Sequence, residues 1–194
     1  MTNQRNRVIA VGVLAGSLSM LTPVPVRADT TSPLSPLVDA TAQRLQIAES
    51  VAAYKWSTQA AIEDPDREQQ ELAGLREDAT AQHLDPDYVV RVFGDQFDAM
   101  VAIEYSRFAD WKLNPADVPP APADLAASRA AIDGLNNKIL SQIAVNWSLL
   151  GSSGCGRALT DASSETIRAH RFGTLYQQAL FRATASFCQA PPPA

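Results

Sequence analysis

The chain has 194 residues, 46% of them hydrophobic, with 16 basic and 21 acidic residues and a net charge of −5. This length suits one domain, and the hydrophobic fraction excludes disorder by composition for most of the chain. The acidic balance argues against a non-specific nucleic-acid binder, which needs clustered basic residues to meet phosphates. It also argues against a helix that lies on a membrane surface, because such a helix carries a basic polar face.

The N-terminal segment has the features of a secretory signal peptide. Arg5 and Arg7 precede an apolar stretch at residues 8–21, which is too short to span a bilayer comfortably, and Val26 and Ala28 are the small residues that signal peptidase reads. We expect cleavage after Ala28, a mature domain of residues 29–194, and a secreted or periplasmic protein. An uncleaved membrane anchor is the alternative. Cleavage removes three arginines and no acidic residue, which leaves 13 basic and 21 acidic residues and a net charge of −8.

The periodicity of the remaining chain predicts an all-α fold, a single-domain helical bundle. Apolar residues recur at helical spacing between breakers, and no strand-length alternation or internal repeat is present. The expected helices cover residues 37–60, 64–83, 85–113 and 124–150, followed by a fifth helical stretch at 161–189.

Breakers explain where these helices begin and end. Asp64-Pro65 and Asp85-Pro86 each place an N-cap acid before a proline at the first helical position, where the missing N–H costs nothing. The Pro- and Ala-rich residues 117–123 form a linker inside the domain, since too little chain lies on either side for two cores. We expect residues 151–156 to form a loop and residues 191–194 to be a frayed tail.

The two cysteines, Cys155 and Cys188, are expected to form a disulfide, because export places them in an oxidising environment. A metal pair or a catalytic thiol is the alternative, and neither has the nearby His and Cys spacing that it needs. His83 and His170 are far apart among polar neighbours, so we expect solvated surface residues and no metal site. Phosphate-loop, HExxH, GxSxG and CxxC motifs are absent from the sequence.

Charged residues stand on faces that should point inward. Arg44 and Lys55 are eleven residues apart, roughly three helical turns, and therefore share the apolar face that carries Ala48 and Val51. Uncompensated burial of a charge costs several kcal/mol, so cations that converge inside a bundle require an anionic partner.

Other helices add to this set. Arg129 lies on an apolar stripe of the fourth helix, and Glu104 lies in the stripe of the third. Arg67 follows Asp64 by three residues at the start of the second helix. Each side chain alone could extend to the surface or form a surface ion pair. Together they indicate a site for a small polyanion, a carboxylate, which arginine meets with two parallel hydrogen bonds.

Several stretches resemble the secreted, γ-class all-helical chorismate mutases, from the signal peptide to the C-terminal tail. The most specific stretches are residues 102–108 (AIEYSRF) with 110–115 (DWKLNP), and then 128–133 with 135–137. Further matches are residues 51–56, 62–64 with Arg67, 85–88, and Cys188 with the proline tail. The resemblance implies an isomerase that converts chorismate to prephenate. It also implies a homodimer in which each site lies within one chain.

The family's site maps onto this sequence residue by residue. Its substrate-binding cations match Arg44, Lys55, Arg67 and Arg129. The carboxyl group that faces the breaking ether bond matches Glu104, and the acid one turn before the second-helix arginine matches Asp64. Two positions depart from the pattern: Met100 stands where the family has a small hydroxyl residue, and Glu71 stands where it has Gln. Glu68, directly after Arg67, is a candidate to hold the substrate hydroxyl.

The implied reaction is a concerted rearrangement of a dicarboxylate that needs no nucleophile, metal or cofactor, and we expect none. The enzyme must hold the substrate in its reactive conformer and stabilise negative charge on the ether oxygen. Lys55, Glu104 and Arg129 are expected to be catalytic. Two alternatives use the same residues: an exported, non-catalytic helical binder of small carboxylates, and a structural protein whose inward charges pair with each other. We expect no nucleic-acid partner, and no membrane contact once the signal peptide is cleaved.

Overall fold

The computed structural model describes residues 31–188, which form helices and no strand, as the all-α prediction requires. The expected signal peptide, its expected cleavage site and the expected tail at residues 191–194 lie outside the described residues. No described helix has the length and apolar content needed to cross a membrane. The helices are α1 (Ser35–Thr58), α2 (Pro65–Ala81), α3 (Pro86–Leu113), the 3₁₀ turn η1 (Pro115–Asp117), α4 (Ala126–Val145), α5 (Trp147–Leu150), α6 (Cys155–His170) and α7 (Thr174–Ala183).

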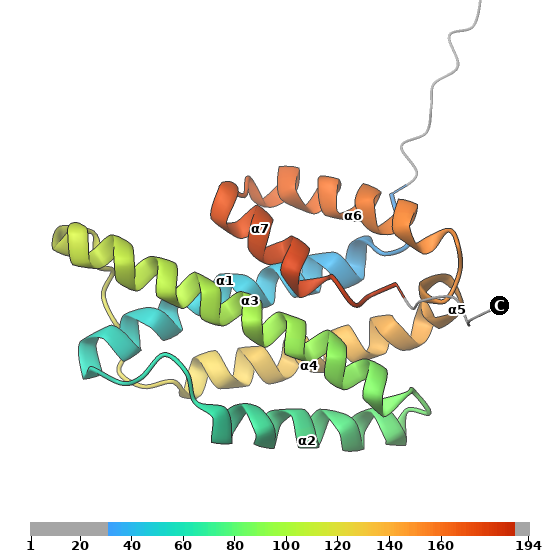
Figure 1. Ribbon diagram of the computed structural model, residues 1–194, viewed down its shortest axis with the longest axis horizontal. Helices are drawn as coiled ribbons and strands as arrows, with labels where there is room; N and C mark the ends of the chain where they lie inside the picture. The colour runs from blue at the N-terminus through green and yellow to red at the C-terminus, as the bar shows by residue number, and fades with distance from the viewer. Residues whose placement is uncertain (1–30, 189–194) are drawn as a thin grey trace, which may run out of the picture. The chain divides into compact units, whose positions relative to one another are not determined.

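Helix α1 is the central element, in contact with α3, α4, α6 and α7, while α2 and α7 also pack on α3. Figure 1 shows α6 and α7 on one side of α1 and α3, with α2 and α4 on the other. Fully buried alanines allow the neighbouring helices to approach α1 closely; they are Ala40, Ala42, Ala48 and Ala52. The arrangement therefore places α1 against α3 and α4, with α2 packed on α3.

The acid–proline starts are confirmed. The Asp64 side chain accepts a hydrogen bond from the backbone N–H of Arg67 at 3.1 Å. The Asp85 side chain accepts from the N–H groups of Asp87 and Tyr88 at 2.9 and 3.2 Å. These bonds satisfy donors that the first turn of a helix leaves free. They fix where α2 and α3 begin.

The expected fourth helix is interrupted at Asn146, which separates α4 from α5. Asn146 has φ −100° and ψ 11°, and its side-chain amide donates to the Gln142 carbonyl at 2.9 Å. Such a side-chain bond competes with regular helix geometry. The sequence prediction of one helix over 124–150 is therefore wrong at this residue.

The expected fifth stretch is two helices, and it begins earlier than predicted. Helix α6 starts at Cys155, so the predicted loop at 151–156 ends at Gly154. Arg171 adopts a left-handed conformation (φ 54°), and its N–H closes the end of α6 on the Arg168 and Ile167 carbonyls. Gly173 then leads into α7. The turn was missed because a left-handed arginine has no signature in the sequence.

The cysteine prediction is confirmed, and one histidine prediction is wrong. Cys155 and Cys188 are bonded, with an S–S distance of 2.02 Å. His83 is exposed as expected. His170 is only partly exposed, because its Nε2 lies 2.8 Å from Asp39 Oδ1 and its ring stacks on Phe172.

Replacing both cysteines with serine should lower the free energy of unfolding by about 3–4 kcal/mol, since the bond closes a loop of moderate length in the unfolded chain. Urea unfolding of the oxidised wild type and of the double variant measures this difference. Reductant should weaken only the wild type. Equal midpoints for the oxidised wild type and the double variant would contradict the expectation.

Candidate active site

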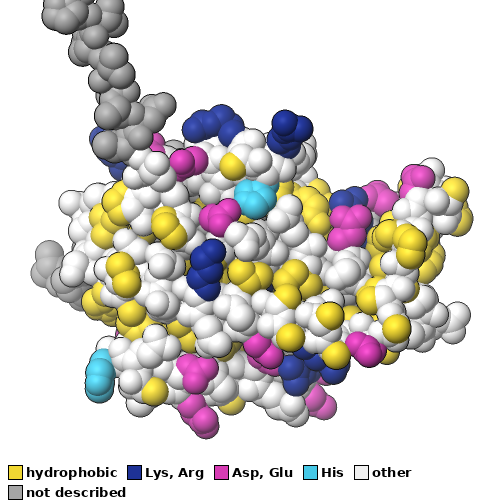
Figure 2. Space-filling model, turned by 180° about the vertical axis from the view of Figure 1, so that it is seen from behind, with side chains coloured by type: hydrophobic (Ala, Val, Ile, Leu, Met, Phe, Trp, Pro, Cys, Tyr) yellow, Lys and Arg dark blue, Asp and Glu magenta, His cyan; other side chains and the backbone are white. Residues whose placement is uncertain are grey.

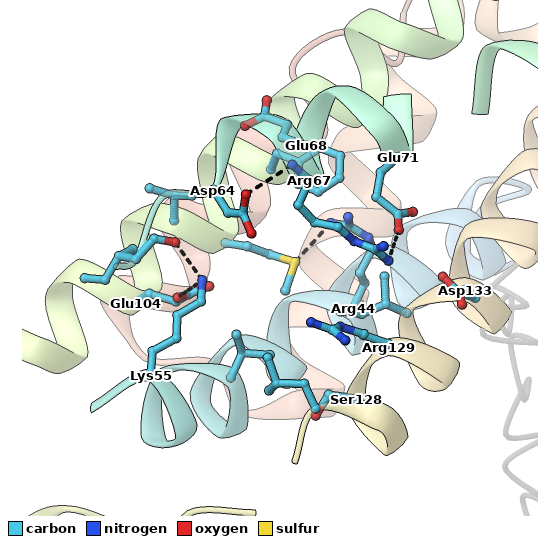
Figure 3. Close-up of a pocket in the computed structure, with 17 residues that line it drawn as sticks. Arg44, Lys55, Asp64, Arg67, Glu68, Glu71, Glu104, Ser128, Arg129 and Asp133 are labelled. Carbon is cyan, nitrogen blue, oxygen red and sulfur yellow. Dashed lines mark hydrogen bonds and ion pairs between the residues drawn. The ribbon is translucent and has the colours of Figure 1, made fainter. Parts of the chain in front are cut away.

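One cavity between α1, α2, α3 and α4 collects every non-cysteine residue that the sequence singled out for the site (Figure 3). Helix α1 provides two of them, α2 and its N-cap four, α3 two and α4 one. They are Arg44, Lys55, Asp64, Arg67, Glu68, Glu71, Met100, Glu104 and Arg129. On the face shown in Figure 2, by contrast, basic side chains stand beside acidic ones and do not gather into a single area.

Arg44 lies at the inner end of this cavity and is fully buried. Its Nε donates to Asn136 Oδ1 on α4 at 2.9 Å, and its Nη1 contacts Met100 Sδ on α3 at 3.1 Å. The guanidinium carbon also lies 4.9 Å from the Phe97 ring centroid, close enough for a cation–π contact. Its Nη2 is buried without a hydrogen-bond partner.

This guanidinium has no paired carboxylate. Within residues 31–188, no acidic group forms an ion pair with Arg44. Burial lowers the pKa of Arg44 to about 10, although the negative charge of Glu71 acts in the opposite direction. Arg44 therefore remains a cation at neutral pH, in a place where an unpaired charge is costly. An anionic ligand would supply the missing partner.

Lys55 and Glu104 form the second charged feature of the cavity. Lys55 Nζ lies 2.8 Å from Glu104 Oε2 and donates to the Ile62 carbonyl at 2.6 Å. Glu104 is only 3% exposed. Burial raises the pKa of Glu104, and the neighbouring Lys55 partly opposes that rise. The ammonium is thus fixed by two oxygens, one from α3 and one from the loop after α1.

The first turns of α2 supply one cation and several acids. Arg67 is ion-paired with Glu71 one turn later, and Asp64 caps the same helix. Glu68 is partly buried and lines the cavity. In Figure 3, Glu71 points toward the guanidinium groups of Arg67 and Arg44. The first turns of α2 therefore place Arg67 next to acidic side chains, so its charge is paired within the protein.

Arg129 differs from the sequence expectation. It lines the cavity, but it is exposed rather than turned into the bundle interior. Along its face of α4, Ile139 and Asn136 are buried, Ile132 is partly exposed and Arg129 is exposed. The first turns of α4 thus face the open side of the cavity, so an apolar stripe did not guarantee burial here.

Sequence reasoning missed several groups that shape the cavity. Asn136 falls within the matched residues 135–137 but was given no role, yet its amide oxygen accepts a hydrogen bond from Arg44. Phe97 lies beside the expected stripe of α3 and contacts the same guanidinium. The Ile62 carbonyl belongs to the backbone, so no residue pattern could have shown it. Within the described part of the chain, no three His, Cys, Asp or Glu residues are placed to hold a metal ion.

Comparison with known proteins gives consistent matches. Residues 35–105 match the family model described as chorismate mutase type II. The chain is 55% identical over 186 residues to the secreted chorismate mutase of Mycobacterium tuberculosis, which covers 96% of this chain and 94% of the relative. It is 48% identical over 162 residues to the secreted chorismate mutase of Mycolicibacterium smegmatis, covering 84% and 90%.

Solved structures agree. The crystal structure of chorismate mutase from Burkholderia phymatum superposes with a TM-score of 0.78 at 26% identity, over 82% of this chain and 98% of that one. The chorismate mutase of Burkholderia thailandensis superposes with a TM-score of 0.75 at 31% identity, over 81% and 99%.

Proposed function

This chain belongs to the chorismate mutase family and is a chorismate mutase, and on that premise we propose that the cavity around Arg44 is where chorismate rearranges to prephenate. The observation that carries the assignment is the fully buried Arg44 guanidinium, whose Nη2 has no protein partner. Chorismate brings two carboxylates, and one of them supplies the anion that this cation lacks. Bidentate pairing with a carboxylate suits the planar guanidinium.

The reaction makes one C–C bond while one C–O bond breaks, with no atom gained or lost. The site must therefore select the chair-like conformer of the substrate and stabilise the charge that develops on the ether oxygen. An ammonium has three N–H donors. Lys55 Nζ donates to the Ile62 carbonyl and lies 2.8 Å from Glu104 Oε2, and it would donate a further hydrogen bond to the ether oxygen.

Glu104 is proposed to meet the same oxygen as a neutral carboxylic acid. A carboxylate would repel the developing charge, whereas a protonated carboxyl group donates a hydrogen bond. The raised pKa of the buried Glu104 favours this form, and the Lys55 charge opposes it. The carboxylates of bound chorismate offset part of the local cationic field, which shifts the balance further toward the protonated acid.

The remaining site residues are proposed to orient the substrate. Arg44, Arg67 and Arg129 clamp its two carboxylates from three different helices. Glu68 accepts a hydrogen bond from the substrate hydroxyl, and Asp64 fixes the turn that carries Arg67. Met100 and Glu71 contact the clamping arginines and modulate substrate affinity.

The relatives named as secreted support export of this chain as well. We propose that residues 1–28 are a signal peptide cleaved after Ala28 and that residues 29–194 are the mature enzyme. We also propose a homodimer. As the family resemblance implies, each protomer of this dimer would carry its own complete site.

Arg44→Ala should lower kcat/KM for chorismate by about a hundredfold or more, because it removes a charge-assisted contact in a dry site. Arg129→Ala should lower it at least tenfold, since its exposed side chain must order on binding. Following chorismate absorbance measures both. Arg168→Ala, an exposed arginine on α6, is the matched control. Wild-type kinetics for a folded Arg44→Ala enzyme would remove Arg44 from the site.

Wild-type activity should fall as pH rises through the pKa of Glu104 in the substrate complex, because the acid then loses the proton that it donates. Glu104→Gln keeps a permanent donor of similar shape, so it should retain much of the rate and lose this decline. The pH profile of kcat for both proteins tests this. A folded, substrate-binding Glu104→Gln enzyme without activity would show that the carboxyl group has another role.

Met100→Thr should lower KM for chorismate about threefold. Met100 is buried at the cavity wall with its sulfur against Arg44. The threonine hydroxyl can accept a hydrogen bond from arginine and donate one to a carboxylate. The methionine thioether accepts only weakly and cannot donate. Steady-state kinetics measure the change. An unchanged or higher KM would mean that residue 100 does not meet the substrate.

A further inference from the structure

We propose that Glu71 is the resident counter-ion of the empty active site, and that a substrate carboxylate displaces it from the arginines when chorismate binds. The inference rests on the proposed function of the cavity and explains how Glu71 sets substrate affinity. Binding is then an exchange of one carboxylate for another.

The ion pair is the first observation. Glu71 and Arg67 are one turn apart on α2 and directly bonded, and both line the cavity. The Arg67 side chain is 45% exposed and that of Glu71 is 21% exposed. Pairs of this kind on one helix contribute little and break readily. A ligand carboxylate can therefore compete with Glu71 for Arg67.

The second observation concerns Arg44. Glu71 is the acid whose charge opposes the effect of burial on the Arg44 pKa, although it makes no ion pair with Arg44. Figure 3 shows Glu71 pointing toward both guanidinium groups. In the empty enzyme, the negative charge of one glutamate thus stabilises the positive charges of two arginines. A substrate carboxylate that bound Arg44 and Arg67 would meet like charge from Glu71 if that side chain stayed in place.

The third observation is the space behind Glu71. A second cavity, between α2 and α4, shares Arg67, Glu71 and Asp133 with the first. Amide side chains able to donate to a carboxylate line it, and they are Gln70, Asn136 and Asn137. At Gly74, on its α2 wall, no atom beyond the adjacent residues and the local helix backbone lies within 4 Å of where a Cβ would stand. Glu71 therefore has a polar space into which it can withdraw.

The same cavity explains why the ion-paired position is preferred before substrate arrives. Asp78 and Asp133 also line it, and their negative charge opposes entry of a third carboxylate. Withdrawal is thus favoured only when a ligand carboxylate takes over Arg67. The cost of that displacement appears in KM, since it is incurred on binding and not in the chemical step.

Glu71→Gln removes the counter-ion while keeping the shape of the side chain. It should lower KM for chorismate and the inhibition constant of prephenate by a similar factor, about three- to tenfold, with kcat within about twofold of the wild type. Glu77→Gln removes the same charge from an exposed position of α2 and should leave both constants unchanged. Circular dichroism checks that each variant is folded.

An unchanged or raised KM for folded Glu71→Gln would overturn the proposal, because Glu71 would then be neutral to binding or a direct substrate partner. A general charge effect would appear instead as equal decreases in KM for the Glu71 and Glu77 variants. An inactive wild type would contradict the proposed function itself, so the two failures are distinguishable.

The withdrawal space is tested separately at Gly74. Gly74→Leu fills the second cavity and should raise KM severalfold with little change in kcat, because Glu71 can no longer leave the arginines. Gly74→Ala adds a single methyl group in open space and serves as the control. A wild-type KM for folded Gly74→Leu would show that Glu71 does not move into this cavity.

Discussion

The buried guanidinium of Arg44 is the constraint around which the rest of the site is arranged. Residues from three helices contribute to its position: Arg44 itself belongs to α1, Asn136 of α4 accepts a hydrogen bond from its Nε, and Met100 of α3 contacts its Nη1. None of these groups neutralises its charge. The fold therefore maintains a cation in a dry place and leaves one nitrogen unpartnered, an arrangement that makes physical sense for a protein that binds a small dianion.

Burial acts in opposite directions at the two ends of the cavity. It lowers the pKa of Arg44, which stays charged, and it raises the pKa of Glu104, which favours the neutral acid. One end is thus suited to hold carboxylates, and the other to donate hydrogen bonds to an oxygen that gains charge. Both ends depend on the same exclusion of water by α1, α2, α3 and α4, so binding and chemistry are set by one packing arrangement.

The sequence was informative where local rules decide the outcome. The eleven-residue spacing placed Arg44 and Lys55 on one face of α1, and acid–proline pairs marked the starts of α2 and α3. It failed where tertiary context decides. The exposure of Arg129 depends on where the cavity opens, and the Ile62 carbonyl reaches Lys55 only through the path of a loop. The left-handed turn at Arg171 likewise has no sequence signature, because a non-glycine residue rarely adopts that conformation.

The stability of Arg44→Met tests the central claim most directly, because methionine fills similar space without charge. Urea unfolding of both proteins, with and without prephenate, measures it. We predict that empty Arg44→Met is at least as stable as the wild type. Prephenate at about a hundred times its dissociation constant should stabilise only the wild type, by about 2.7 kcal/mol. An empty variant several kcal/mol less stable than the wild type, or one stabilised equally by prephenate, would contradict the account.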